Sequence, residues 1–307
     1  MALDDATQQL LKGMAEQGGP ALHEMTVEQA RQMSDGLAGL FGAGPEVAQH
    51  EVTRIPVAGG TIAAHVYKPS AQPEGAVIYY HGGGWVIGSP PGFDTLARKL
   101  AVMSGCTVVL PDYRLAPEYR FPTAADDAYA TLEWTSANLD GLARTGAPII
   151  VAGDSAGGNL STVTALRSRD RKGPRVAFQA LVYPVTDCRL DTESYLDPAN
   201  ELFLTKSAME WFWDHYVPDA AARTSPDASP LRAELANLPP AIVLTAEQDV
   251  LRDEGEAYAA ALKAAGNDVE MHRIAGQMHG FFTMPNLLPG HDTGMELVIS
   301  AVKRALR

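Results

Sequence analysis

The sequence predicts an α/β fold in which a mostly parallel sheet is covered by helices on both faces, and three observations support this. Short apolar segments of strand length alternate along the chain with longer helix-like segments. A serine flanked by glycines stands between one such strand and the helix that follows it. The chain has 307 residues, which is enough to bury one large core. Parallel strands joined in this way need helices on both faces.

The elements are expected in a regular order. Residues 51–57 and 61–67 alternate apolar and polar side chains around two glycines, which predicts an antiparallel hairpin. Six further strands, making eight, are expected near 76–80, 106–110, 149–153, 178–183, 241–246 and 268–274. Helices are expected near 92–104, 122–137, 156–170, 253–265 and 293–306. Right-handed crossovers then place the carboxyl ends of the parallel strands along one edge.

Two segments fall outside this alternation. Residues 1–46 are helix-like and rich in Met, Gln and Ala, and we expect them to form an N-terminal cap segment. Residues 186–235 interrupt the core strands and are expected to form a cap insert, in which Thr205 is positioned to cap a helix. The core therefore consists of residues 47–185 and 236–307.

The cap insert carries aromatic side chains at helical spacing. Met209, Phe212, Trp213 and Tyr216 predict one apolar helix face. That face either packs the insert onto the core or also forms a wall of a substrate pocket, and the sequence leaves both open. The candidate pocket residues are Trp85, Tyr183, Phe203, Trp213 and Phe281.

Ser155 is the candidate nucleophile. The Gly-Asp-Ser-Ala-Gly stretch at 153–157 follows an apolar strand and precedes a helix, and small residues at its ends permit a sharp turn that exposes the hydroxyl. A structural turn that happens to contain serine is the alternative. A serine hydroxyl needs a base, a group that orients the base, and donors for an oxyanion.

The candidate oxyanion donors follow an earlier strand. Three glycines at 82–84, flanked by His81 and Trp85, allow backbone amides to approach a ligand closely. With the amide after the nucleophile, the expected donors are Gly83, Gly84 and Ala156, although a flexible glycine turn would look similar. His81 precedes the loop, so we expect it to hold the loop in place rather than act as the base.

The acid and the base are expected after the serine, each just past a strand. Asp249 follows the strand near 241–246, with Glu247 as its rival. His279 lies in a glycine-flanked loop after the strand near 268–274, whereas His272 alternates within that strand. Asp249 and His279 are therefore the candidate orienting acid and general base.

Five ordered motifs resemble the hormone-sensitive-lipase-like (family IV) carboxylesterases of bacteria. They are His-Gly-Gly-Gly-Trp at 81–85, Asp-Tyr-Arg-Leu-Ala-Pro-Glu at 112–118, Gly-Asp-Ser-Ala-Gly-Gly-Asn at 153–159, Asp-Val-Leu-Arg-Asp-Glu at 249–254 and His-Gly-Phe at 279–281. The resemblance implies an α/β-hydrolase fold with a helical cap, and a carboxylesterase active on short- to medium-chain acyl esters. It also implies that Ser155, Asp249 and His279 are the catalytic triad, with Gly83, Gly84 and Ala156 as the oxyanion hole. Val250 departs from the proline that many members have after the acid.

The composition narrows the possible partners. A net charge of −13 disfavours nucleic acid and anionic membranes, and no apolar run approaches the roughly 18 residues of a membrane span. The first residues lack the pattern of a secretory signal, so a cytoplasmic location is expected. The two cysteines predict neither a disulfide framework nor a metal site.

These observations predict a serine esterase with an acyl-enzyme intermediate and a small-molecule ester as substrate. No metal or organic cofactor is expected. An amidase or peptidase, a lipase active on long chains and a non-enzymatic receptor remain alternatives, the last because one fold supports many functions. The family resemblance also implies a possible homodimer, with the edge of strand 268–274 as the candidate interface, because related enzymes are often dimers through the edge of their final strand.

Overall fold

The computed structural model describes residues 2–307, so residue 1 of the predicted N-terminal segment lies outside the described residues. One sheet with the strand order β1-β2-β4-β3-β5-β6-β7-β8 forms its centre. Its strands are β1 (Gln49–Val57), β2 (Gly60–Lys68), β3 (Ala76–Tyr80), β4 (Thr107–Pro111), β5 (Ile149–Asp154), β6 (Val176–Val182), β7 (Ala241–Gln248) and β8 (Val269–Met278). β2 pairs antiparallel with β1 and β4, and all other pairs are parallel. This confirms the predicted eight-stranded, mostly parallel sheet.

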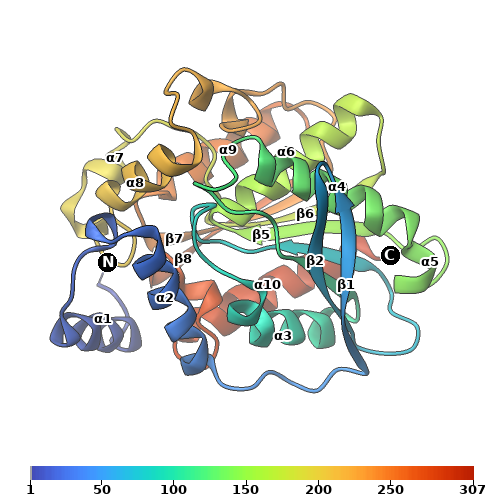
Figure 1. Cartoon of the computed structure of the whole chain (residues 1–307), viewed down its shortest axis with the longest axis horizontal. Helices are drawn as coiled ribbons and strands as arrows, with labels where there is room; N and C mark the ends of the chain where they lie inside the picture. The colour runs from blue at the N-terminus through green and yellow to red at the C-terminus, as the bar shows by residue number, and fades with distance from the viewer. Residues whose placement is uncertain (1) are drawn as a thin grey trace.

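Helices cover both faces of the sheet, as predicted (Figure 1). One face carries α3 (Asp94–Ser104) and α10 (Pro289–Ala305), which pack on each other and on the sheet. The other face carries α4 (Thr123–Ala137), the short α5 (Leu139–Leu142), α6 (Ala156–Arg171) and α9 (Arg252–Ala264). The strands between these two layers are buried on both faces, which is why their sequences are mostly apolar runs.

Four helices lie outside these layers and gather at one side of the sheet (Figure 1). They are α1 (Asp5–Gln17), α2 (Val27–Ala38), α7 (Glu193–Leu196) and α8 (Lys206–Tyr216). Thr205 caps α8 as predicted, because its hydroxyl oxygen accepts a hydrogen bond from the Ala208 amide at 3.1 Å. These helices come from the two segments that interrupt the strand–helix alternation.

The strand boundaries differ from the predicted ones mainly in β8. This strand continues to Met278, four residues beyond the predicted end, because β7 and β8 resume pairing at Gln248 and Met278 after an irregularity. The extension carries the chain directly to His279. Paired strands, rather than a free loop, therefore position that histidine.

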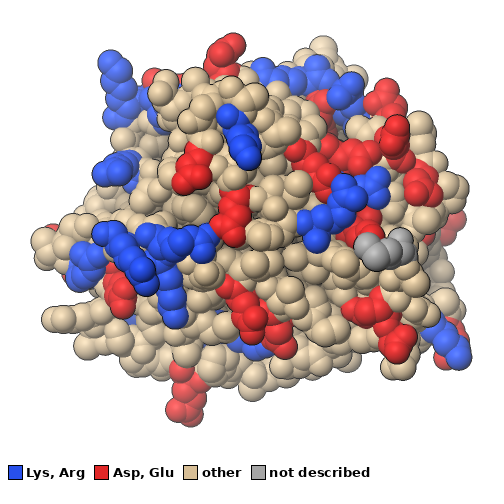
Figure 2. All heavy atoms as spheres, turned by 180° about the vertical axis from the view of Figure 1, so that it is seen from behind, with Lys and Arg blue, Asp and Glu red and all other residues tan. Residues whose placement is uncertain are grey.

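Charged side chains are interspersed over the surface seen in Figure 2, with wide uncharged areas between them. Within residues 2–307, no helix combines the length and the apolar character needed to cross a membrane.

Candidate active site

Ser155 lies on a sharp turn between β5 and α6. Its backbone has φ 54° and ψ −118°, a conformation that L-residues rarely adopt. The turn can form because glycine follows at position 157, where a Cβ would overlap the carbonyl oxygen of Tyr80 at the end of β3. The close approach of the first turn of α6 to the end of β3 therefore requires glycine, and the turn leaves the serine hydroxyl at the edge of the sheet.

The structure brings Ser155, His279 and Asp249 together in one hydrogen-bonded series. The Nε2 atom of His279 lies 3.2 Å from the Ser155 Oγ, and its Nδ1 lies 2.8 Å from the Asp249 Oδ2. The three residues are 6%, 7% and 1% exposed, so bulk water competes little for these bonds. Because the carboxylate accepts from Nδ1, the Nε2 lone pair is free to accept from the serine hydroxyl.

The structure also separates Asp249 from its rival. The Oε2 atom of Glu247 accepts from the Gly276 amide at 2.8 Å, so this carboxylate is held against the backbone of β8. The Oδ1 atom of Asp249 accepts from the Leu251 amide at 2.9 Å, which orients its other oxygen toward His279. Asp249 is therefore the carboxylate that contacts the histidine.

The loop that carries Asp249 is fastened to the cap insert by side chains that the sequence did not reveal. Glu254 is buried, and its Oε1 accepts from the amides of Thr186 at 2.7 Å and Asp187 at 3.3 Å. The hydroxyl of Ser194 donates to the Val250 carbonyl at 2.7 Å. These bonds hold the loop that contains Val250. The signal for Glu254 was its spacing, since it lies one turn before a buried tyrosine on α9.

Burial raises the pKa of Glu254 to about 8, so this carboxyl keeps its proton at neutral pH. In the sequence, Glu254 stands in the first turn of the helix expected near 253–265, where acidic residues are common. The helix does begin where expected, but this side chain points into the protein rather than toward solvent.

Backbone amides near the serine are arranged as the predicted donors. Gly83 and Gly84 have φ 106° and 57°, and a Cβ at position 84 would overlap the ring of Phe212. Across residues 2–307, no protein acceptor is hydrogen-bonded to the amides of Gly83, Gly84 or Ala156. Three unbonded amides beside a nucleophilic hydroxyl can stabilise a negatively charged oxygen.

His81 holds this loop from behind, as its position in the sequence suggested. Its Nδ1 donates to the Gly82 carbonyl at 2.7 Å, and its ring stacks on Tyr113 with centroids 4.3 Å apart. Burial lowers the pKa of His81 to about 4, so the imidazole is neutral at ordinary pH. It shapes the loop, whereas the imidazole hydrogen-bonded to Ser155 is that of His279.

A cavity of about 520 Å³ opens above the serine. Its lining includes Ser155, His279, Gly83 and Gly84 together with mostly apolar side chains from the N-terminal segment and the cap insert. The N-terminal segment contributes Leu11, Met14, Leu22, Met25, Met33 and Leu37, and the insert contributes Leu202, Phe203, Leu204, Ala208 and Phe212. The segments that interrupt the core thus supply most of the wall around the substrate space.

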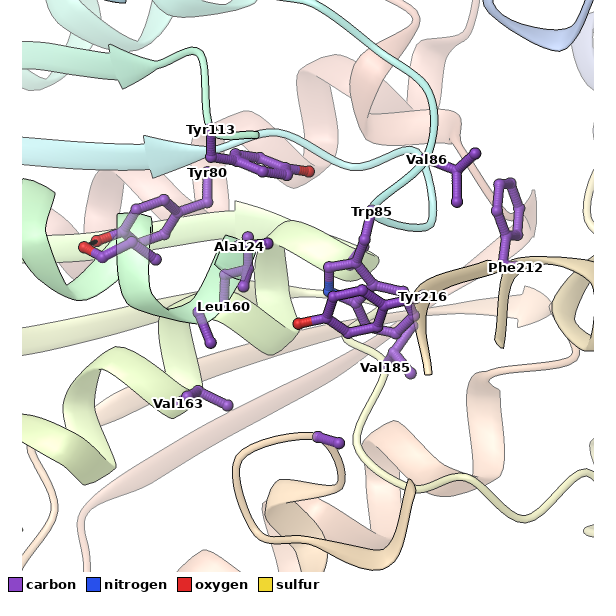
Figure 3. Packing of buried hydrophobic residues seen from close by; sticks show 14 of the residues in the cluster. Tyr80, Trp85, Val86, Tyr113, Ala124, Leu160, Val163, Val185, Phe212 and Tyr216 are labelled. Carbon is purple, nitrogen blue, oxygen red and sulfur yellow. Dashed lines mark hydrogen bonds between the residues drawn. The ribbon is translucent and has the colours of Figure 1, made fainter. Parts of the chain in front are cut away.

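Four of the five predicted pocket residues lie behind this wall, which corrects that part of the prediction. Trp85, Tyr183, Trp213 and Phe281 are fully buried and do not line the cavity. Trp85 stacks on Tyr216 with centroids 4.3 Å apart, as Figure 3 shows. Its backbone has φ 61°, and its side chain lies in the core rather than at the cavity.

Phe203 is the one predicted pocket residue that lines the cavity, and Phe212 is a second aromatic wall. Phe212 precedes Trp213 on α8, so the two rings leave the helix about 100° apart. The Phe212 ring reaches the cavity beside Gly84, and the Trp213 ring packs against Trp85 with 5.0 Å between the ring centroids. Tyr183 lies beside the His279 ring at 4.4 Å and so supports the histidine.

Comparison with known proteins agrees with this geometry. A family described as having the alpha/beta hydrolase fold matches residues 77–283. A carboxylesterase of Mycobacterium tuberculosis (strain ATCC 25618 / H37Rv) is 39% identical over 251 residues, which cover 80% of this chain and 79% of that protein. The chain belongs to the hormone-sensitive-lipase-like carboxylesterases of the α/β-hydrolase fold. It is thus a carboxylic ester hydrolase.

Other ester hydrolases are similar to a comparable degree. An ethyl acetate hydrolase of Pseudomonas putida is 37% identical over 256 residues, covering 81% of this chain and 80% of that protein. The solved structure of a hyperthermophilic esterase from the archaeon Pyrobaculum calidifontis has a TM-score of 0.95, with 39% identity and complete coverage of both chains. The likeness therefore extends over the segments that surround the cavity as well as over the core.

Proposed function

We propose that this carboxylesterase hydrolyses short- to medium-chain acyl esters through Ser155, His279 and Asp249, with an acyl-enzyme intermediate. The observation that carries the proposal is the buried hydrogen-bonded series from Asp249 through His279 to Ser155, which ends in an apolar cavity. A base and an orienting carboxylate in this arrangement activate an otherwise weak nucleophile.

In the first half-reaction, the Ser155 oxygen attacks the ester carbonyl carbon while its proton passes to the His279 Nε2. The carbonyl oxygen gains negative charge and accepts hydrogen bonds from the Gly83, Gly84 and Ala156 amides. Asp249 stabilises the imidazolium that forms. His279 then gives the proton to the alkoxide, so the C–O bond breaks and the alcohol leaves.

In the second half-reaction, a water molecule takes the place of the alcohol. His279 accepts a proton from the water, whose oxygen attacks the acyl carbon of the Ser155 ester. The same amides stabilise the oxyanion, and the proton on His279 returns to the serine oxygen as the acid is released. The acid and the alcohol account for all the atoms of the ester and the water.

The cavity supports the chain-length part of the proposal. Its volume of about 520 Å³ is within the range of pockets that enclose a small organic molecule, and its lining is mostly apolar. Apolar walls favour an uncharged acyl chain, because burying a methylene stabilises the complex by about 0.8 kcal/mol. The ethyl acetate hydrolase among the relatives is named for a small ester, which supports the same substrate class.

The test is hydrolysis of p-nitrophenyl esters from acetate to palmitate by the wild type and by Ser155→Ala. We expect the highest kcat/KM at short to medium chains and a loss of at least about 10³-fold in the variant. Activity that survives in Ser155→Ala would exclude this nucleophile. A maximum at palmitate would exclude the chain-length assignment while leaving the carboxylesterase intact.

We also propose a homodimer through strand 268–274. β8 is the last strand of the sheet, so one side of it has no neighbouring strand within residues 2–307. Met271 on this strand is 44% exposed, which is consistent with a surface that a partner could cover. Light scattering that finds only a monomer at micromolar concentration would exclude the dimer.

The cytoplasmic location stays a prediction from the sequence.

A further inference from the structure

Asp154 is a buried carboxyl beside the nucleophile that the proposed mechanism does not use. It is the last residue of β5, it is 4% exposed, and it lines the same cavity as Ser155. Its Oδ1 accepts a hydrogen bond from the Gly82 amide at 2.9 Å and another from the Tyr79 hydroxyl at 2.8 Å. One oxygen atom therefore joins the ends of two neighbouring strands.

This bond connects the two parts of the oxyanion hole. Gly82 immediately precedes Gly83 and Gly84, whose amides come from the loop after β3. The third amide, that of Ala156, belongs to the turn after β5, two residues beyond Asp154. All three must point at one oxygen atom, and removing a single donor from such a site typically costs about 10²- to 10³-fold in rate.

Backbone packing sets a lower limit on the distance between these two parts of the oxyanion hole. A Cβ at position 82 would overlap the Asp154 Oδ2, and a Cβ at position 157 would overlap the Tyr80 carbonyl oxygen. The loop and the turn are thus already in close contact and cannot approach further. Among the side-chain hydrogen bonds of the described residues, the one that joins residues 82–84 directly to residues 154–157, and so opposes their separation, is the Asp154–Gly82 bond.

We propose that Asp154 is a positioning residue that fastens the oxyanion loop, residues 82–84, to the nucleophile turn, residues 154–157. This rests on the function proposed above, because the positioned amides are those of its oxyanion hole. The carboxyl acts through Gly82 and does not touch the reacting atoms. Its contribution is therefore to transition-state stabilisation rather than to substrate binding.

The chemistry of the bond predicts which substitutions are tolerated. Both hydrogen bonds end on Oδ1, so an amide oxygen at the same place can accept them as a carboxylate does. Asp154→Asn is therefore expected to keep the loop in position. Asp154→Ala removes the acceptor, and Asp154→Leu removes it while keeping the branched shape of the side chain.

The experiment measures kcat, KM and the Ki of phenylboronic acid, whose tetrahedral serine adduct occupies the oxyanion hole. We expect Asp154→Ala and Asp154→Leu to lower kcat by about 10- to 100-fold and to raise Ki, with KM within about threefold. Asp154→Asn should retain at least about a third of the wild-type kcat. Tyr79→Phe is the matched control: it removes the other bond to the same oxygen and should change kcat by less than about threefold.

Three outcomes would overturn the proposal. The first is a kcat within about threefold of wild type in both Asp154→Ala and Asp154→Leu. The second is an equal loss of kcat in Asp154→Asn and Asp154→Ala, and the third is a rise in KM without a fall in kcat. If Asp154→Ala does not fold, the Leu and Asn variants still decide the question. Ser155→Ala in the same assay separates failure of this proposal from failure of the proposed function.

Discussion

Replacing the buried Glu254 with glutamine should change how the stability of the protein depends on pH. The glutamine oxygen can still accept from the amides of Thr186 and Asp187, so the contacts of the folded state are kept. What the variant loses is the titrating proton of the carboxyl group. Burial raises the pKa of Glu254 from its ordinary value of 4.5 to about 8.

The sign of the effect follows from proton binding. Between about pH 4.5 and 8 the folded protein holds a proton on Glu254 that the unfolded chain has released. The free energy of unfolding therefore falls as the pH rises, by about 1.4 kcal/mol per pH unit. The variant lacks this pH-dependent loss. Its free energy of unfolding minus that of wild type should therefore increase by roughly 2–3 kcal/mol between about pH 5.5 and 7.5.

Urea unfolding followed by circular dichroism at several pH values measures this difference directly. Glu296→Gln removes an exposed carboxylate from α10 and is the control, for which we expect the same pH dependence as wild type. Wild type and Glu254→Gln giving parallel plots of unfolding free energy against pH would refute the reasoning. That result would mean that Glu254 titrates at its ordinary pKa despite its burial.

Two further predictions concern the cavity and the segment that covers it. His279 gives its proton to the leaving alkoxide, so the alcohol part of the ester lies beside His279. The Phe203 ring is close to this place, since it lies 3.1 Å from the position that a Cβ on the adjacent Gly280 would occupy. In a series of butyrate esters with alcohols of increasing length, Phe203→Ala should therefore change the dependence of kcat/KM on alcohol length by about fourfold per added carbon. An unchanged dependence on alcohol length would exclude this contact. Arg31 on α2 donates from Nε to the Val86 carbonyl and from Nη2 to the Ala116 carbonyl, both at 2.9 Å. Arg31→Ala should raise KM by roughly tenfold as α2 loosens, and an unchanged KM with a lower melting temperature would assign it a purely structural role.

The sequence alone was sufficient to predict the sheet and the chemistry at its edge. Apolar runs of strand length that alternate with helical segments permit few arrangements other than a parallel sheet with helices on both faces. Ser155, Asp249 and His279 each follow a strand, so the same rule predicts that they meet. These inferences depend on local patterns and chain order, which a single sequence contains.

Tertiary structure decided which side chains face the cavity. Phe212 and Trp213 are adjacent on one helix, and their spacing predicts an apolar face that includes both. The packing of Trp85 on Tyr216 places Trp213 in the core and leaves Phe212 at the wall. Helical periodicity cannot separate such neighbours, because the core and the cavity are both apolar.

Tertiary structure also decided the roles of Asp154 and Glu254. In the sequence, the first is a residue within a motif and the second is an ordinary helix-start acid. Each becomes significant only because a segment distant in the chain brings amides to it, at Gly82 in one case and at Thr186 in the other. Burial and hydrogen bonding between distant segments are properties of the assembled fold, whereas strand order and the serine turn are already present in the local sequence.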